Sequence, residues 1–134
     1  MTREELLGMW RADAAARCKM REIEHLRDLR ERVTTCLRAD AACASGAGDR
    51  LGDLTGAILD LENELKDDIE RGIRCRREFE RVVSRFASPQ EYEVMHRRYV
   101  QFESFDVIAK GMHYSRSAIH KIHERALKKV EFSP

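Results

Sequence analysis

The sequence has 134 residues, a formal net charge of +1 at pH 7, 37% charged residues and 7% aromatic residues. This composition favours a small helical protein with a narrow apolar seam over a protein with a thick core. Alternating runs of β-branched and aromatic residues are absent, so no sheet is expected. No stretch approaches the roughly 18 consecutive apolar residues of a membrane span, and residues 2–17 carry charges throughout instead of an export signal. We therefore expect a cytoplasmic protein without membrane partners.

The first predicted helix runs from about Thr2 to Leu37. Thr2 and Glu5 have the spacing of a capping box at its start. Apolar residues then recur at steps of three and four, which places them on one helix face: Met20, Ile23, Leu26, Leu29, Val33 and Cys36. Residues 39–50 are mostly small and include two glycines, which predicts a flexible loop.

A second helix is predicted from about Leu51 to Phe86. Its apolar seam approaches a heptad repeat and consists of Leu51, Leu54, Ile58, Leu61, Leu65, Ile69, Gly72, Phe79, Val83 and Phe86. A repeat of this length indicates a coiled coil. The facing helix is either residues 2–37 of the same chain, folded back as a hairpin, or a second copy of the chain, and the sequence does not decide between them.

A third helix is predicted over Pro89 to about Val100. Ser88, Pro89 and Glu91 provide an N-cap, a first-turn proline and a capping-box partner. Cysteines at four scattered positions show no paired spacing, and we expect free, partly buried thiols: Cys18, Cys36, Cys43 and Cys75.

Net positive charge is concentrated near the C-terminal end of the sequence. Residues 1–87 hold 17 Lys and Arg against 18 Asp and Glu, whereas residues 88–134 hold 8 against 6. Within 115–130 there are five basic residues and one acid, Glu124. A local excess of this kind marks the place where a polyanion would bind, although a cluster of charges alone also fits a solvated helix face.

Residues 104–131 match a helix-turn-helix position by position. Ser104 caps a short predicted helix over Phe105 to Gly111, and Ala109 is the small residue at the close helix crossing. Met112 and Tyr114 flank the turn, and Ser115 caps the second helix. The inward face of that helix is predicted to hold Ile119, Ile122, Ala126, Leu127 and Val130. A short turn between two such helices is typical of this motif.

The outward face of this second helix carries the candidate DNA contacts. Arg116 and His120 are the first candidates for base contacts, and Ser117 and Lys121 are the second, because a recognition helix presents its N-terminal residues to the bases. Residues further along, and the two helix caps, are candidates for phosphate contacts: Arg125, Lys128, Lys129, Ser104 and Ser115. The competing interpretation is a small helical bundle with a basic surface.

These residues carry a family resemblance. Ile108-Ala109 and the stretch from Tyr114 to Val130 resemble region 4 of bacterial sigma-70-type RNA polymerase sigma factors, with Arg116, the pair Ile119 and Ile122, and the Ala-Leu-Lys-Lys ending as the shared marks. The resemblance implies a domain that reads the −35 promoter element and docks on the polymerase β-flap.

The chain also resembles small proteins encoded by phages and prophages of Gram-positive bacteria. The similar segments are residues 60–64, the glycine-rich loop before them, Arg97-Arg98-Tyr99 and residues 126–130. The resemblance covers most of residues 18–131 and is firmer in the C-terminal third. It implies a transcriptional regulator with a helical coiled coil, and as partners double-stranded DNA and bacterial RNA polymerase.

The sequence departs from the sigma pattern at three positions. Ser117 stands where sigma factors commonly have an acid, and Ala118 where they have a basic residue, so the usual −35 sequence does not follow as the target. His113 occupies the turn position usually held by glycine, where φ is often positive. Gly111, two residues earlier, indicates that the turn is locally reshaped. No sigma region 2 is recognisable, so promoter melting by this chain alone is not expected.

No enzymatic chemistry is expected. His120 and His123 lie one turn apart with His113 nearby, but zinc needs three or four convergent ligands and no cysteine is close in sequence. Phosphate loops, nucleophile elbows and HExxH motifs are absent, so neither a cofactor nor catalysis is predicted. Two alternatives to a DNA-binding regulator stay open: a coiled-coil interaction protein that does not read DNA, and a small terminase-like subunit of a DNA-packaging machine.

Overall fold

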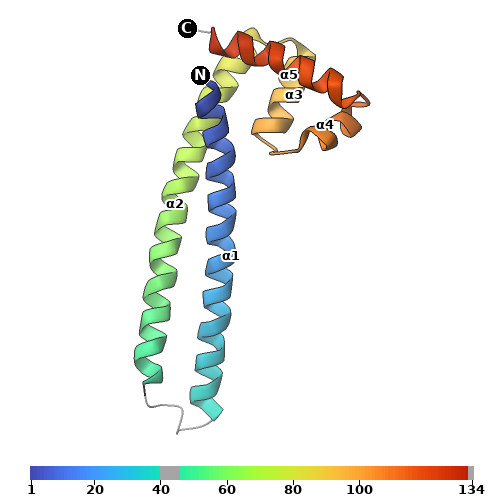
Figure 1. Ribbon diagram of the computed structural model, residues 1–134. Coiled ribbons are helices and arrows are strands. Elements are labelled where there is room, and N and C mark those ends of the chain that lie inside the picture. The colour runs from blue at the N-terminus through green and yellow to red at the C-terminus, as the bar shows by residue number, and fades with distance from the viewer. Residues whose placement is uncertain (40–45, 133–134) are drawn as a thin grey trace. The chain divides into compact units, whose positions relative to one another are not determined.

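The computed structural model describes residues 1–39 and 46–132, except for the side chains of Ala47 and Phe86. These ranges form five α-helices and no strand (Figure 1). The helices are α1 (Arg3–Ala39), α2 (Ala47–Phe86), α3 (Pro89–Tyr99), α4 (Phe105–Met112) and α5 (Arg116–Glu131). The predicted all-α class is confirmed. None of the described helices combines the length and apolarity needed to cross a membrane.

The predicted loop at 39–50 is only partly covered by the described residues. Residues 40–45, with Cys43, lie outside them. α2 begins at Ala47, before the expected start at Leu51, and the predicted loop was therefore too long. Cys18 and Cys75 are free but exposed, and Cys36 is also exposed, so the expected partial burial of these thiols is wrong.

The chain divides into two compact units, which we name by their residues. The helix-pair unit is Asp13–Arg71, and the terminal unit is Met1–Ala12 together with Gly72–Pro134. The predicted domain boundary between residues 87 and 88 stays a prediction. The C-terminal end of α2 and the first turns of α1 belong to the same unit as α3, α4 and α5.

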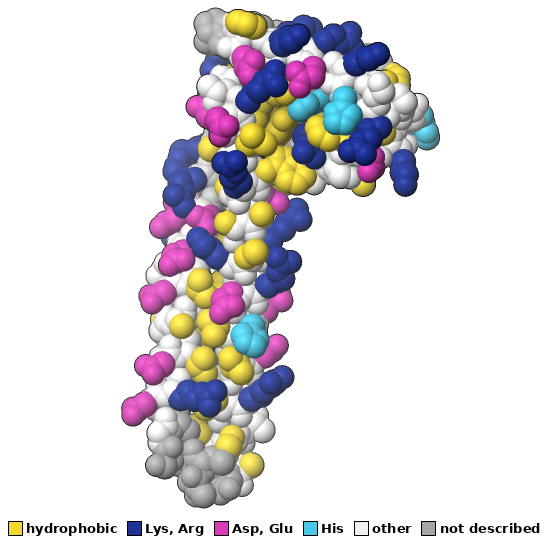
Figure 2. Space-filling view, in the orientation of Figure 1, with side chains coloured by type: hydrophobic (Ala, Val, Ile, Leu, Met, Phe, Trp, Pro, Cys, Tyr) yellow, Lys and Arg dark blue, Asp and Glu magenta, His cyan; other side chains and the backbone are white. Residues whose placement is uncertain are grey.

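In the helix-pair unit, parts of α1 and α2 pack antiparallel. Lys19 of α1 contacts Asp68 of α2 at 2.5 Å, and Arg27 contacts Glu62 at 2.5 Å, so the numbers rise along one helix and fall along the other. Among the described residues of the unit, the buried apolar residues are Ile23 and Ile58. Figure 2 shows a thin apolar strip between the two helices, with charged side chains on both sides.

The predicted seam is wrong at several positions. Met20 and Ile69 are 53% and 50% exposed, and Gly72 is also exposed, whereas Lys19 and Asp68 are largely shielded within the contact between the helices. An ion pair thus occupies the place where the apolar pattern predicted side-chain packing. The last predicted seam residue, Phe86, has a side chain outside the described set.

The terminal unit has a continuous apolar core built from four helices. Leu6 and Met9 of α1 pack with residues of α2, α3 and α5. The buried members are Leu6, Met9, Phe79, Val82, Val83, Met95, Tyr99, Ala126, Leu127 and Val130. A second cluster beside it joins α3, α4 and α5 through Val94, Ile108, Ala109, Ile119 and Ile122. Burial of these side chains fixes α5 against the rest of the unit.

Two predicted capping boxes start helices of this unit. The Thr2 backbone N–H donates to the Glu5 carboxylate at 2.7 Å, and the Glu5 N–H donates to the Thr2 hydroxyl at 3.2 Å. Ser88 and Glu91 make the same reciprocal pair at the start of α3, with Pro89 in the first turn. Each box satisfies two backbone donors that a helix start leaves free.

Candidate nucleic-acid interface

A three-residue turn joins α4 to α5. His113 ends α4 with φ 60° and ψ 38°, so the positive φ predicted at this position is confirmed. The Tyr114 N–H donates to the Ala109 carbonyl at 3.0 Å and closes the helix end. Ser115 then starts α5 by accepting the Ala118 N–H at 3.1 Å, as Ser104 starts α4 by accepting the Val107 N–H at 3.3 Å. Both serine caps were predicted.

Small residues in α4 allow close approach of other elements. Ala109 is 7% exposed and packs in the cluster shared with α5, as expected for a helix crossing. Gly111 lies inside α4 and not in the turn, so the expectation that it reshapes the turn is wrong. A Cβ atom at Gly111 would lie 2.6 Å from a guanidinium nitrogen of Arg97, so that flexible side chain would have to move if another residue replaced the glycine.

The inward face of α5 contains every residue predicted for it. Ile119 and Ile122 are buried in the cluster with α4, and the later three predicted residues are buried in the main core. At 100° per residue, the opposite side of the helix is centred on Ser117, Lys121 and Lys128. All three are exposed.

Basic side chains gather along this outward face. Figure 2 shows dark blue Lys and Arg side chains along α5. Within the described residues, Lys121, Arg125 and Lys128 take part in no ion pair, so their charges are available to an external anion. A shallow, open groove follows the same face, and Gln90 of α3 and Tyr114 of the turn also line it.

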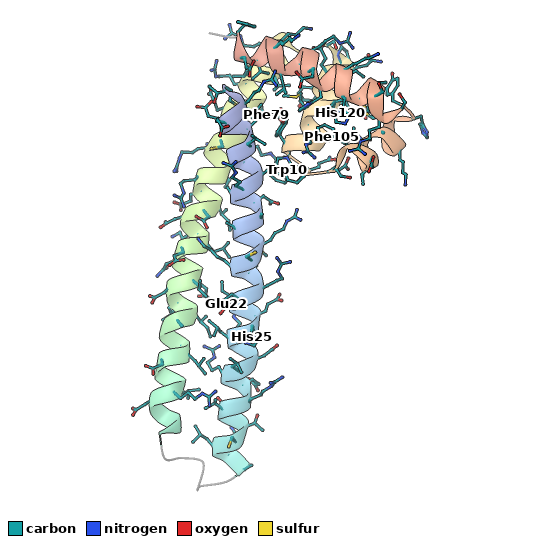
Figure 3. All side chains as sticks on the ribbon, viewed as in Figure 1. Trp10, Glu22, His25, Phe79, Phe105 and His120 are labelled. Atoms are coloured by element: carbon teal, nitrogen blue, oxygen red, sulfur yellow. The ribbon has the colours of Figure 1, made fainter. Side chains whose placement is uncertain are left out.

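The two leading candidates for base contacts lie at the flank of this face. The Arg116 guanidinium is 3.5 Å from the Asp106 carboxylate of α4, and both side chains are about two-thirds exposed. The His120 ring packs against the Phe105 ring with centroids 4.4 Å apart (Figure 3). Ser117 and Lys121, which ranked second from the sequence, therefore lie nearer the centre of the exposed face.

The candidates for phosphate contacts differ in how they are held. Ser104 and Ser115 are both exposed helix caps, but the first turn of α4 contains Asp106, whereas the first turn of α5 contains no acid. The N-terminus of α5 is therefore the better place for an anion. Lys129 differs from Arg125 and Lys128, because its ammonium group contacts Glu91 of α3 at 2.8 Å.

The Glu91–Lys129 pair has a structural role. Glu91 is 4% exposed and also accepts the Ser88 backbone N–H within the capping box. Burial alone would raise the pKa of the Glu91 carboxyl, but Lys129 and the Ser88 N–H together hold that pKa below its usual value. Lys129 therefore keeps a buried carboxylate charged and fixes α5 to α3.

His123 was considered only as part of a histidine cluster, and the structure places it in the core. Its Nε2 atom lies 2.8 Å from the Tyr99 hydroxyl, and the two rings stack. Burial, with a contribution from the charge of Arg98, lowers the pKa of His123 to about 4. Burial also raises the pKa of Tyr99 to about 12. At neutral pH the hydrogen bond therefore joins an uncharged phenol to an uncharged imidazole.

Arg98 connects the first helix to the fourth. Its guanidinium carbon lies 4.2 Å from the Trp10 ring centroid and 4.1 Å from the Phe105 ring centroid. Trp10 also meets the Phe102 ring edge-on, with centroids 5.6 Å apart. Because Phe105 in turn contacts His120, this stack links the start of α1 to the flank of the exposed α5 face.

Sequence reasoning missed two residues near this face. Gln90 donates a hydrogen bond to the Tyr114 hydroxyl, and both residues line the groove. Arg3 reaches α5 from the first turn of α1 and contacts Glu124 at 3.1 Å. These contacts join residues far apart in sequence, and no periodic pattern could have indicated them.

Comparison with known proteins finds no match among protein-family models, curated proteins or solved structures. Within the ranges 1–39 and 46–132, no group of three or more His, Cys, Asp or Glu side chains is arranged to hold a metal ion. The assignment of function therefore depends on the geometry of the α5 face.

Proposed function

We propose that this protein is a DNA-binding transcriptional regulator in which α4 and α5 form a helix-turn-helix. In this proposal α3, α4 and α5 are the three helices of the domain, and the antiparallel helix pair is a hairpin-type coiled coil. The observation that carries the proposal is the exposed face of α5, with three basic side chains that take part in no ion pair among the described residues. Such a face suits the major groove of double-stranded DNA.

The turn geometry supports the same assignment. The left-handed residue His113, the cap at Ser115 and the buried Ile119 fix where α5 starts and which side faces outward. Ser117 and Lys121 are proposed to contact base edges, with Arg116 and His120 at the flank. Arg125, Lys128 and the N-terminus of α5 at Ser115 are proposed to contact phosphates.

RNA polymerase is proposed as a partner on the resemblance to sigma region 4 alone. A role for the helix pair as an interaction surface is supported by a separate observation. Met20, Leu59 and Ile69 are each about half exposed, although they are large and apolar. If the interaction role is the main one, binding to a protein partner will depend on these residues, and substitutions on the α5 face will leave it unchanged.

Selection from a pool of random DNA duplexes tests the proposal. We expect the wild-type protein to enrich one sequence. Lys121→Ala should weaken binding to that sequence by about 1–3 kcal/mol if Lys121 contacts a base. Lys128→Ala should weaken binding to all duplexes by the same factor. It should also reduce the dependence of affinity on salt concentration by the equivalent of about one phosphate contact. Lys66→Ala, an exposed lysine of the helix-pair unit, is the matched control.

The result that would contradict the proposal is equally defined. If the wild-type protein binds all duplexes weakly, and if Lys66→Ala and Lys121→Ala reduce binding equally, then α5 does not read DNA. Arg116→Ala in the same assay tests whether the flank of the face contributes to DNA binding. In the wild-type protein, release of the Arg116 guanidinium from Asp106 would allow Arg116 to reach a guanine.

A further inference from the structure

The first turn of α1 brings a positive charge to the outward face of α5. The Arg3 guanidinium contacts the Glu124 carboxylate at 3.1 Å and the Glu131 carboxylate at 2.5 Å. The backbone of this turn is fixed by the Thr2–Glu5 capping box, and Leu6 is completely buried one turn later. Arg3 is thus held at α5 by a rigid helix start.

Glu124 is the single acid among residues 115–130 of the sequence. It follows Lys121 by three residues and precedes Lys128 by four, so all three lie on the same side of α5. Glu124 also borders the groove along the basic face, whereas Glu131 does not. An unpartnered carboxylate at this position would repel a phosphate chain that approaches Lys121 and Lys128.

The Arg3–Glu124 pair is poorly explained by folding stability. The two side chains are 45% and 52% exposed, and exposed ion pairs contribute little to the stability of a fold. The pair changes the charge pattern instead. Arg3, which Glu131 also contacts, offsets part of the Glu124 charge, so a phosphate chain that approaches Lys121, Arg125 and Lys128 meets less repulsion.

We infer that Arg3 is a positioning residue of the polyanion-binding surface, which acts by holding the Glu124 carboxylate and offsetting its charge. The inference rests on the proposed DNA binding by α5, and it adds the start of α1 to that interface. Arg3 need not touch the DNA, because screened charges act over about 8 Å at physiological salt. The nucleic-acid surface would then include residues separated by more than a hundred positions in the chain.

A double-mutant cycle with Arg3→Ala and Glu124→Gln tests this inference. The probe is one mixed-sequence double-stranded DNA, and affinity is measured at low and at physiological salt. Arg3→Ala should lower affinity about three- to ten-fold at low salt, and less as salt screens the charge. Glu124→Gln should bind as well as the wild type or better. In the Glu124→Gln background, Arg3→Ala should have a much smaller effect than in the wild-type background.

Two matched controls separate this role from a structural one. Glu131→Gln removes the other partner of Arg3 but lies outside the groove, so it should leave affinity unchanged. Arg11→Ala removes an exposed arginine of α1 whose paired acid, at 4.0 Å, is Glu4, and should also leave affinity unchanged. Circular dichroism shows whether Arg3→Ala still folds; if it does not, Arg3→Lys is expected to keep wild-type affinity while Arg3→Gln loses it.

The outcomes distinguish the inference from the function on which it rests. If the wild type binds DNA and Arg3→Ala binds equally well, the inference is overturned and the proposed function stands. If Arg3→Ala loses the same factor with and without Glu124, then Arg3 does not act through this carboxylate, which also overturns it. If the wild type fails to bind any duplex, both proposals fall.

Discussion

The same two helices are used in different ways in the two units of this protein. In the terminal unit, α1 and α2 contribute Leu6, Met9 and Phe79 to a core that other helices complete. In the helix-pair unit, only Ile23 and Ile58 are buried among the described residues, and ion pairs connect the helices. The comparison shows that a long amphipathic pattern does not predict which part of a helix buries most of its apolar side chains.

The largest expected effect tests whether the start of α1 belongs to the terminal core. Leu6→Ala should destabilise the protein by about 2–5 kcal/mol, because Leu6 is completely buried and its truncation leaves a cavity. Leu7→Ala, at a neighbouring residue that is 42% exposed, is the matched control and should cost much less. Urea denaturation followed by circular dichroism measures both. Equal losses would mean that residues 1–12 are not part of this core.

A smaller loss is expected in the helix-pair unit. Ile58→Ala should cost about 2 kcal/mol, at the low end for a buried isoleucine, because a two-helix contact can close around the missing atoms. Leu59→Ala, at 54% exposure, is the control. Amide hydrogen exchange should show faster exchange in residues 13–71 for Ile58→Ala and little change in α5. Faster exchange throughout the chain would show that the two units unfold together.

Acid should weaken the terminal unit through His123. The unfolded imidazole has a pKa of about 6.5, whereas burial lowers the pKa of the folded one to about 4. Stability from this group is complete above pH 6.5 and is lost as the pH falls toward 4, because only the unfolded chain takes up the proton. Between pH 7 and pH 5 the loss should be about 2 kcal/mol.

The variant His123→Gln isolates this effect in denaturation experiments at the two pH values. His123→Gln should reduce the difference in the free energy of unfolding between pH 7 and pH 5. His120→Gln should keep the wild-type difference, because the His120 ring is only half-buried. A pH dependence that is the same in His123→Gln and in the wild type would show that other groups cause it.

The smallest expected effect concerns the turn between α4 and α5. His113 has φ 60°, a conformation that glycine adopts at less cost than other residues. His113→Gly should therefore stabilise the terminal unit by about 0.5–1 kcal/mol, measured as an increase in the free energy of unfolding. Because the His113 side chain is exposed, little packing is lost. A net destabilisation would mean that the imidazole makes a contribution in the turn that outweighs the backbone strain.

Local rules predicted the parts of the fold that depend on neighbours in sequence. The caps at Ser88, Ser104 and Ser115, the positive φ of His113 and the buried side of α5 all follow from spacing within one or two helical turns. These features require only backbone donors, steric limits and helical periodicity.

Contacts between distant segments could not be predicted in the same way. Apolar periodicity favoured Met20 and Ile69 as seam residues, but the pairing of α1 with α2 brings Lys19 to Asp68 instead. Lys129 was expected to be available to phosphate, yet Glu91 lies beside it after folding. A pattern within one helix shows which sides differ in polarity, but the partner's register decides which side is covered.

The single tryptophan of the sequence gives the terminal unit an optical signal of its own. Trp10 lies between the guanidinium of Arg98 and the edge of Phe102, and its indole N–H is buried without a hydrogen-bond partner among the described residues. Its fluorescence should therefore be emitted from a partly buried site and shift to longer wavelength when unfolding exposes the ring to water. Because the helix-pair unit contains no tryptophan, the midpoint of this shift reports the melting of one unit alone, and its difference from the midpoint of helix loss measures how tightly the two are coupled.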